Sequence, residues 1–424
     1  MTGDRGRSRR PLEVRALEPT NVLIGVVGKT NVGKSTFFSA ATDLPVPIEN
    51  RPFVTIEPNV GVGYARKRCA HVDLGLPRCD PVNSVCIMGN RLIPVKLMDV
   101  AGLIPGAHQG RGLGNKFLDD LRRSDIFLLV VDASGSTNEE GVPVEPGTYD
   151  PVEEVKFVVE EIDLWMYQSI RSDWDRFTRL VQMGAVKDPL EAFAQRVSGF
   201  GITRGQVEQA LGSLRISGTE LPKLGDDDLL RLVKELRRMT KPMVIVANKV
   251  DVPGSERNVE RLASSFPGTP VIPTSSLAET ILKRLAKQGV ISYVPGDPEF
   301  KLLLRPQDAR AQRALDMIRD LMERFRGTGV VQSINAALFD VLKLIAVYPV
   351  EDFNRYTDRQ GRVLPDVLLV PSGTTARELA YRVHTELGDT FLYAVNAKTK
   401  QRVGASYRLQ DNDVIKIVAA GARG

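Results

Sequence analysis

The sequence predicts a doubly wound α/β sheet that carries a helical insertion and ends in a small β-grasp domain. Short apolar runs alternate with helix-compatible segments around a glycine-rich loop near the N-terminus. From residue 150 onward, a long stretch has apolar residues at helical spacing, and near the C-terminus short strand-like runs surround one helix. Alternating strands and helices favour a parallel sheet whose ligands bind at the carboxyl ends of the strands.

The glycine-rich loop reads Gly-Lys-Thr-Asn-Val-Gly-Lys-Ser over residues 28–35 and fits the pattern G-x-x-x-x-G-K-[ST], which is typical of P-loop NTPases. A predicted strand at residues 22–27 precedes it, and a predicted helix at residues 36–42 follows. Lys34 can place its charge on the outer phosphates, and the Ser35 hydroxyl can bind Mg²⁺. The helix N-terminus adds partial positive charge. The residues predicted to contact phosphate are Gly28, Asn31, Val32, Gly33, Lys34, Ser35 and Thr36.

A second motif indicates the base. Asn-Lys-Val-Asp at residues 248–251 follows a predicted buried strand at residues 242–247. The Asp251 carboxylate can accept hydrogen bonds from the ring N–H and the exocyclic amine of guanine, a pair of donors that adenine lacks. Asn248 can brace the loop and meet the base edge, and the Lys249 stem can lie over the ring. The motif therefore predicts guanine binding.

Weaker signals complete the predicted site. A predicted strand at residues 95–99 ends in Asp99, which can hold Mg²⁺ through water, and the Gly102 N–H can meet a γ-phosphate. Thr55 lies in the loop between the first helix and the next strand and is the candidate second Mg²⁺ ligand. The loop after a predicted strand at residues 270–273 adds two candidate base contacts, Ser275 and Ser276.

Taken together, these motifs resemble the Obg-type translation-factor GTPases, most closely the YchF subfamily in its archaeal form. Thr55 lies in a Pro-Phe-x-Thr-Ile-Glu-Pro-Asn-Val-Gly context, and residues 99–103 read Asp-Val-Ala-Gly-Leu. The run Gly-Ala-His-Gln-Gly-Arg-Gly-Leu-Gly-Asn at residues 106–115 is the most specific part. The resemblance extends over nearly the whole chain from Val22. It implies a GTP-hydrolysing switch that acts on the ribosome or in translation and carries a C-terminal TGS domain.

Three positions bear on the implied chemistry. Bacterial and eukaryotic YchF proteins typically carry Glu in place of Asp251 and favour ATP, so Asp251 predicts GTP here, with ATP use as the alternative. Leu103 stands where many GTPases have a water-orienting Gln, so we expect slow intrinsic turnover. Asn31 resembles the residue that helps hold K⁺ in related GTPases, and K⁺ or a partner could supply the missing group. The predicted catalytic residues are Lys34, Asn31, Gly102 and Thr55.

Composition predicts a soluble, cytoplasmic protein without membrane association, and we expect a monomer. The chain has 424 residues, enough for two or three domains, and no run approaches the roughly 20 apolar residues of a membrane span. Three cysteines cannot form a disulfide framework. The net charge of +5 agrees with a ribosome or RNA partner besides GTP and GDP. A nucleotide-stabilised RNA-binding module with incidental hydrolysis is a further alternative.

The cysteines gather in one segment with a histidine. Cys69, His71, Cys79 and Cys86 lie between two predicted strands and supply ligand types that zinc takes. Their spacing, C-x-H-x₇-C-x₆-C, lacks the C-x₂-C pair of standard zinc sites. The sequence alone therefore favours a connecting segment with buried thiols, and a structural zinc is the alternative.

Compositional changes divide the chain into five expected parts. These are a basic flexible arm (1–20), a nucleotide-binding domain (21–149 and 239–304), a helical insertion (150–238), connecting helices (305–343) and a TGS-like β-grasp domain (344–421). The start of the insertion, Asp-Pro-x-Glu at residues 150–153, is a good helix start.

Within the C-terminal parts, a helical pattern is expected over residues 334–345, and a β-grasp helix over residues 376–384 with Gly388 able to end it. Basic residues are expected to interact with RNA phosphates at two places. These are the N-terminal arm, with Arg5, Arg7, Arg9 and Arg10, and an exposed turn with Lys398, Lys400 and Arg402.

Overall fold

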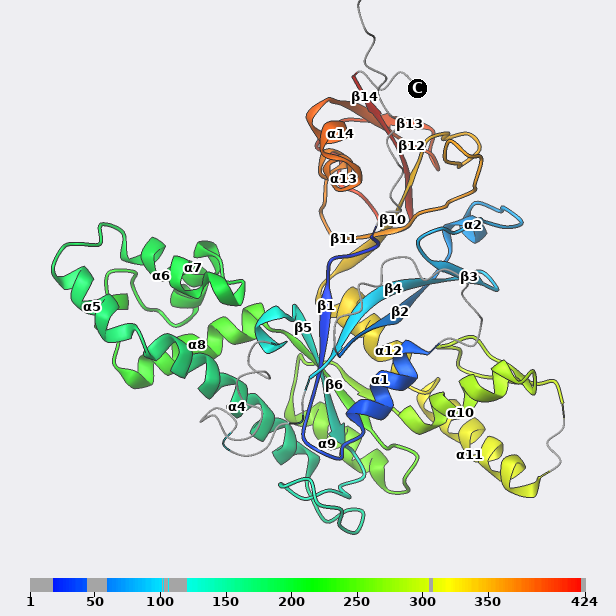
Figure 1. The fold of residues 1–424 in the computed structure, drawn as a ribbon, viewed down its shortest axis with the longest axis horizontal. Helices are drawn as coiled ribbons and strands as arrows, with labels where there is room; N and C mark the ends of the chain where they lie inside the picture. Colours follow the sequence, from blue (N-terminus) through cyan, green and yellow to red (C-terminus); the bar gives the residue numbers. More distant parts are fainter. Residues whose placement is uncertain are drawn as a thin grey trace, which may run out of the picture. The chain divides into compact units, whose positions relative to one another are not determined.

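The computed structural model describes residues 18–43, 59–100, 102, 106, 120–304 and 308–420 (Figure 1). The chain divides into two compact units. The larger contains residues 21–67 and 92–344, and the smaller contains residues 1–20, 68–91 and 345–424. Three of the dividing points fall inside strands, after residues 67, 91 and 344, and residues 68–91 group with the C-terminal residues. The five-part domain division stays a prediction.

The larger unit is built on the predicted doubly wound sheet, with strand order β2-β4-β1-β5-β6-β7. A further strand, β3, pairs with β4, and its residues belong to the smaller unit. β1 pairs in parallel with β4 and β5, and β6 pairs in parallel with β5 and β7. The strands are β1 (Leu23–Val27), β2 (Val60–Arg68), β3 (Val85–Ile87), β4 (Asn90–Asp99), β5 (Ile126–Asp132), β6 (Met243–Asn248) and β7 (Val271–Pro273). The register places Asp132 beside Asn248, so both strands end at the same edge.

Helices accompany the sheet along the chain. They are α1 (Lys34–Thr42), α9 (Ser255–Ser265), α10 (Ser276–Lys287), α11 (Ala309–Phe325) and α12 (Val330–Asn335), the last continuing as a π-helix over Ala336–Val341. A short hairpin of β8 (Ile291–Ser292) and β9 (Lys301–Leu302) follows α10. No helix in the described ranges is long and apolar enough to cross a membrane.

The insertion after β5 is helical, as predicted. It contains α4 (Pro151–Arg171), α5 (Trp174–Gln182), α6 (Pro189–Val197), α7 (Arg204–Ser213) and α8 (Asp226–Thr240). Asp150 caps α4, because its Oδ1 accepts a hydrogen bond from the Val152 N–H at 3.0 Å. Pro151 occupies the first turn, where a missing N–H costs nothing.

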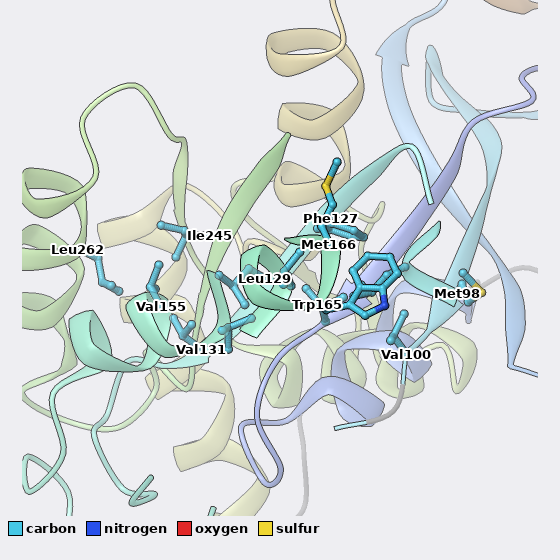
Figure 2. Close-up of a cluster of buried hydrophobic side chains, with 14 of the residues drawn as sticks. Met98, Val100, Phe127, Leu129, Val131, Val155, Trp165, Met166, Ile245 and Leu262 are labelled. Carbon is cyan, nitrogen blue, oxygen red and sulfur yellow. The ribbon is translucent and has the colours of Figure 1, made fainter. Parts of the chain in front are cut away.

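One hydrophobic core joins the insertion to the sheet (Figure 2). Phe127 and Leu129 of β5 belong to the same cluster as Val155, Trp165 and Met166 of α4. Trp165 is 5% exposed, and its ring meets the Phe200 ring edge-on at 5.4 Å between centroids. The first insertion helix is therefore held against the sheet by buried apolar surface, which is the dominant stabilising term in folding.

The smaller unit contains a β-grasp sheet with strand order β11-β10-β14-β12-β13. Its elements are β10 (Leu344–Val350), β11 (Leu368–Pro371), β12 (Phe391–Asn396), β13 (Gln401–Val403), β14 (Asp413–Ala419), α13 (Ala376–Val383) and α14 (Thr385–Asp389). Val347, Leu379, Ala394 and Ile415 form its core, so the helix packs on the sheet as a β-grasp requires. The short helix α2 (Ala70–Asp73) belongs to this unit.

Two predicted helix boundaries are wrong. The pattern over residues 334–345 does not stay helical, because the π-helix ends at Val341 and β10 begins at Leu344. The β-grasp helix ends at Val383, since His384 takes an extended backbone with φ −165° and ψ 137°. The His384 Nδ1 accepts a hydrogen bond from the Glu386 N–H at 3.2 Å and so starts α14, which contains Gly388.

Candidate nucleotide-binding site

The phosphate-binding loop connects β1 to α1 at the carboxyl edge of the sheet. Its backbone has positive φ at Gly28 (151°), Asn31 (62°) and Gly33 (96°). A Cβ atom on Gly33 would lie 2.3 Å from the Asn248 side-chain nitrogen, and one on Gly28 would lie 2.3 Å from the Val130 carbonyl oxygen. Both positions therefore exclude any residue larger than glycine.

Lys34 is the buried cation of this loop. It is 8% exposed, and its Nζ donates to the Lys29 carbonyl oxygen at 2.6 Å. Burial lowers the pKa of Lys34 to about 8, while Asp99 and Glu154 act in the opposite direction. A Cβ atom on Gly102 would lie 3.1 Å from the same Nζ, so the Gly102 backbone lies beside the lysine. A phosphate bound here would supply the negative charge that favours protonated Lys34.

The residues proposed for magnesium fit a hard cation. Ser35 Oγ lies 3.4 Å from Asp99 Oδ2. Mg²⁺ usually keeps several waters, so an ion bound to the Ser35 hydroxyl could be held by the nearby Asp99 carboxylate through one of them. Burial raises the pKa of Asp99, against the opposing effect of Lys34. A divalent cation would stabilise the charged form of this carboxylate. Thr55, the other predicted ligand, lies outside the described residues.

Asn248 links the predicted base-binding motif to the phosphate-binding loop. Its Nδ2 donates to the Val32 carbonyl oxygen at 2.9 Å. Its Oδ1 accepts from the Ser276 backbone N–H at 3.2 Å and from the Ser276 hydroxyl at 2.9 Å. Nearby, the Ser275 hydroxyl donates to Asp251 Oδ1 at 2.6 Å. The loops after β6 and β7 are thereby held together, with the Asp251 carboxylate oriented by a serine.

A buried carboxylate outside the set of predicted site residues supports the base-binding loop. Asp132, at the end of β5, accepts hydrogen bonds from Lys249 at 2.7 Å, Ser136 at 2.9 Å and Thr137 at 3.0 Å, and its other oxygen accepts from Ser134. Burial alone would raise the pKa of Asp132, but the bonds from Lys249 and Ser134 more than offset it and lower the pKa. This ion pair fixes the Lys249 side chain. The sequence signal that could have indicated Asp132 was an apolar run that ends in an aspartate.

A second set of contacts holds Lys29 and Asn31, which stand at variable positions of the phosphate-binding loop pattern. The buried Lys29 ammonium lies 3.2 Å from a Glu154 carboxylate oxygen and 4.3 Å from the centre of the Tyr149 ring. Burial raises the pKa of Glu154, and Lys29 opposes this rise. The Asn31 amide donates to the Gly141 carbonyl oxygen at 2.9 Å. The segment between β5 and α4 thus packs on the loop, an arrangement that no short motif signals.

The structure places nearly all of the predicted nucleotide-site residues on the larger unit. Those of the phosphate-binding loop and its helix are Gly28, Asn31, Val32, Gly33, Lys34, Ser35 and Thr36, and those of the other loops are Asp99, Gly102, Asn248, Lys249, Asp251, Ser275 and Ser276. Thr55 and Leu103 lie outside the described residues. The roles assigned to individual residues stay predictions.

A strand-loop-helix phosphate cradle joined through an asparagine to an Asn-Lys-x-Asp loop defines the class of P-loop GTPases. Comparisons with known families agree. A family model described as 50S ribosome-binding GTPase matches residues 23–156. A model for the G4 motif-containing domain of the Obg-like GTPase YGR210-like proteins matches residues 246–352, and a TGS domain model matches residues 354–419.

Individual relatives cover most of the chain. A protein of Methanocaldococcus jannaschii named as an uncharacterized GTP-binding protein is 50% identical over 399 residues, which are 94% of this chain and 99% of the relative. The crystal structure of a GTP binding protein from Pyrococcus horikoshii matches with a TM-score of 0.74 at 41% identity, covering 94% of this chain and 100% of that chain. The protein named ribosome-binding ATPase YchF of Mycoplasma genitalium is 34% identical over 53% of this chain and 55% of its own length.

This chain belongs to the YchF-type branch of the Obg-like GTPases, with a C-terminal TGS domain. The resemblance inferred from the motifs is confirmed, and so is the α/β fold with its appended β-grasp domain. GTPases of this kind generally use Mg²⁺. The chain is therefore an enzyme of the GTPase class.

Proposed function

We propose that the protein is a slow GTP-hydrolysing switch that acts on the ribosome in the cytoplasm. The observation that carries the proposal is the hydrogen bond from Asn248 to the Val32 carbonyl oxygen. It joins the loop that would read the base to the loop that would hold the phosphates. A guanine nucleotide that contacted both loops would therefore couple the base to the phosphate site.

In this proposal each part of the site has one task. Backbone N–H groups of the phosphate-binding loop and the Lys34 ammonium bind the phosphates and stabilise charge that develops on them. Asp251, oriented by Ser275, accepts both guanine donors. Ser35 and Asp99 would hold Mg²⁺, which neutralises charge on the β- and γ-phosphates when bound. The Gly102 backbone lies beside Lys34, and its N–H is the proposed contact to the γ-phosphate.

We propose that K⁺ bound at Asn31 compensates for the leucine at position 103. The Asn31 amide nitrogen is used on Gly141, so its Oδ1 is the atom that a cation would take. Because Asn31 has φ 62°, the variant Asn31→Gly removes the side chain without backbone strain. We expect wild-type GTP turnover to be faster in K⁺ than in Na⁺, and Asn31→Gly to lose that difference while GDP affinity stays. Equal wild-type turnover in both salts would refute the K⁺ site.

The ribosome is the proposed partner because the family model over residues 23–156 and a YchF relative both carry ribosome-binding names. The β-grasp domain offers cations for RNA phosphates. Lys400 and Arg402 are exposed, and each lies over a tyrosine ring, at 4.5 Å from the Tyr356 centroid and 3.6 Å from the Tyr393 centroid. Together with Lys398, these residues form a basic cluster on aromatic supports.

Co-sedimentation with ribosomal subunits tests this partner. We expect binding that differs between GDP and a non-hydrolysable GTP analogue and weakens steeply with salt, because phosphate contacts release counterions. The triple variant Lys398→Ala, Lys400→Ala, Arg402→Ala should bind more weakly with a flatter salt dependence, and so should deletion of residues 1–17. GDP affinity should not change, since the nucleotide site lies on the other unit. Equal sedimentation of all three proteins, or none at low salt, would contradict the proposal.

Two alternatives predict different results. A module that uses nucleotide only as a structural ligand would bind subunits equally with GDP and the GTP analogue. An ATPase, as the name of the Mycoplasma relative states for that protein, would prefer adenine nucleotides. The presence of Asp251 favours guanine, because adenine would cover this partly buried carboxylate without offering it the two guanine donors.

A further inference from the structure

A compact cluster of three sulfur atoms and one imidazole lies in the smaller unit. Ligand atoms of Cys69, His71, Cys79 and Cys86 all lie within 4.8 Å of one another. Cys69 precedes α2, His71 lies in it, Cys79 lies in the following loop, and Cys86 is the central residue of β3. Residues spread over 18 positions of sequence thus converge on one point.

The spacing of these atoms matches the ligand shell of one tetrahedral zinc ion. Zinc binds sulfur at about 2.3 Å and imidazole nitrogen at about 2.0–2.1 Å, so tetrahedral geometry puts two sulfurs about 3.8 Å apart and sulfur and nitrogen about 3.6 Å apart. In the structure Cys69 Sγ lies 3.8 Å from Cys79 Sγ, and Cys86 Sγ lies 3.7 Å from His71 Nδ1. A disulfide would need two sulfurs at about 2.05 Å and would leave the histidine without a role.

The surroundings provide a balancing charge. Zinc with three thiolates and a neutral histidine carries a net charge of −1. Arg91 is completely buried, and its Nη1 lies 3.7 Å from Cys79 Sγ. The same guanidinium donates to the Leu364 carbonyl oxygen and lies 5.3 Å from the Tyr348 ring centroid, so it is held in place. Buried charges are stable when they are paired, and outer partners of this kind orient metal ligands.

The segment also has little else to hold it together. Its fully buried apolar side chains between residues 69 and 89 are Cys69 and Ala70, and its other buried residues are His71 and Asn83. Hydrogen bonds attach its middle to the β-grasp part of the unit, from Asp80 N–H to the Val363 oxygen at 2.8 Å and between Asn83 and Val367 at 2.9 and 3.0 Å. Small segments without an apolar core are commonly stabilised by a metal or disulfides.

We propose that Cys69, His71, Cys79 and Cys86 bind a structural zinc ion. All four positions are filled by protein, which is the closed arrangement of structural rather than catalytic zinc. The ion would fix α2, the loop after it and β3 as one rigid element of the smaller unit. This revises the interpretation of the segment as a connection with buried thiols. The proposal is independent of the proposed function, because the nucleotide site lies on the larger unit.

Metal analysis of the full-length protein, purified without a polyhistidine tag, tests the proposal. We expect about one zinc per chain by mass spectrometry of the metal content. Cys79→Ala and Cys86→Ala should each lose most of it, whereas His384→Asn, which removes a histidine elsewhere on the same unit, should retain it. GDP affinity shows whether the larger unit stays folded in each variant. Absence of zinc, iron in its place, or an intact Cys69–Cys79 disulfide in protein purified under reducing conditions would overturn the proposal.

Measurements on the wild-type protein avoid dependence on variants that fail to fold. Titration of the thiols with a mercurial should release zinc to a chromogenic chelator in proportion to thiols modified. Replacement by Co²⁺ should give the absorption bands of a tetrahedral thiolate-bound ion. Removal of the metal should lower the melting temperature by about 5 °C or more, because metal-binding free energy contributes directly to folding. Release of no zinc and an unchanged melting temperature would count against the site.

Discussion

Replacing Lys34 with alanine is expected to reduce the affinity for GDP by about two orders of magnitude. The lysine is buried in the phosphate-binding loop and is the proposed charge partner of the outer phosphates. Removing one member of a buried, hydrogen-bonded charge pair costs about 3 kcal/mol or more, which is about a hundredfold in affinity. Isothermal titration with GDP in Mg²⁺ measures the loss. Lys187→Ala, an exposed lysine of the same unit, should bind like wild type.

The same lysine should make nucleotide binding depend on pH. Burial lowers the pKa of Lys34 to about 8 in the free protein, whereas bound phosphate would raise it. Below pH 8 the lysine is charged in both states, so affinity is constant. Above pH 8 binding must take up a proton, and affinity should fall by up to about tenfold per pH unit. Lys34→Ala should lack this dependence. Affinity that does not change between pH 7 and 9 in the wild type would contradict the assignment.

Replacing Asp251 is expected to change which base the protein accepts. Hydrogen bonds to a charged acceptor contribute about 1.5–3 kcal/mol each, so losing both should weaken GDP binding to Asp251→Ala by about two to four orders of magnitude. ADP binding should hardly change, because adenine makes no use of the carboxylate. Fluorescent GDP and fluorescent ADP, titrated in parallel into the wild-type protein and the variant, measure both effects.

A gain of binding tests Asp251 more sharply than a loss. The amide of Asp251→Asn can donate a hydrogen bond to the 2-oxo group of xanthine, where guanine has an amine. We therefore expect this variant to bind xanthosine diphosphate better than GDP, reversing the wild-type order. Asp227→Ala, an exposed carboxylate of the same unit, is the matched control and should leave both affinities unchanged. If Asp251→Asn retained wild-type GDP affinity, the carboxylate would not be the base-reading group.

The sequence was sufficient where one local pattern dictates the backbone. The predicted strands before Gly28 and Asn248 are present as β1 and β6, because continuous apolar runs bounded by turn residues are typical of buried parallel strands. The N-cap at Asp150 was also predictable, because it depends only on Asp150 itself and the few residues that follow it. The hydrogen bond from Asn248 to the phosphate-binding loop could be expected, because the carboxyl ends of parallel strands lie at the same edge of a sheet.

Long-range polar contacts were not predictable from such patterns. The Lys29–Glu154 pair joins residues 125 positions apart, and nothing near either residue signals the partner. The helix boundary at His384 depended on one backbone conformation and one capping bond. The cysteine cluster has a nonstandard spacing, and only its convergence in three dimensions distinguishes zinc ligands from separate thiols.

The most direct test of the central claim is a comparison of GDP and ADP binding to the wild-type protein. Both nucleotides, carrying the same fluorophore, are titrated into the full chain at pH 7 in Mg²⁺. A site in which Asp251 reads guanine predicts that GDP binds about a hundredfold tighter or more, because adenine would cover the carboxylate without supplying the two guanine donors. ADP binding equal to or tighter than GDP binding would contradict a GTP-dependent switch.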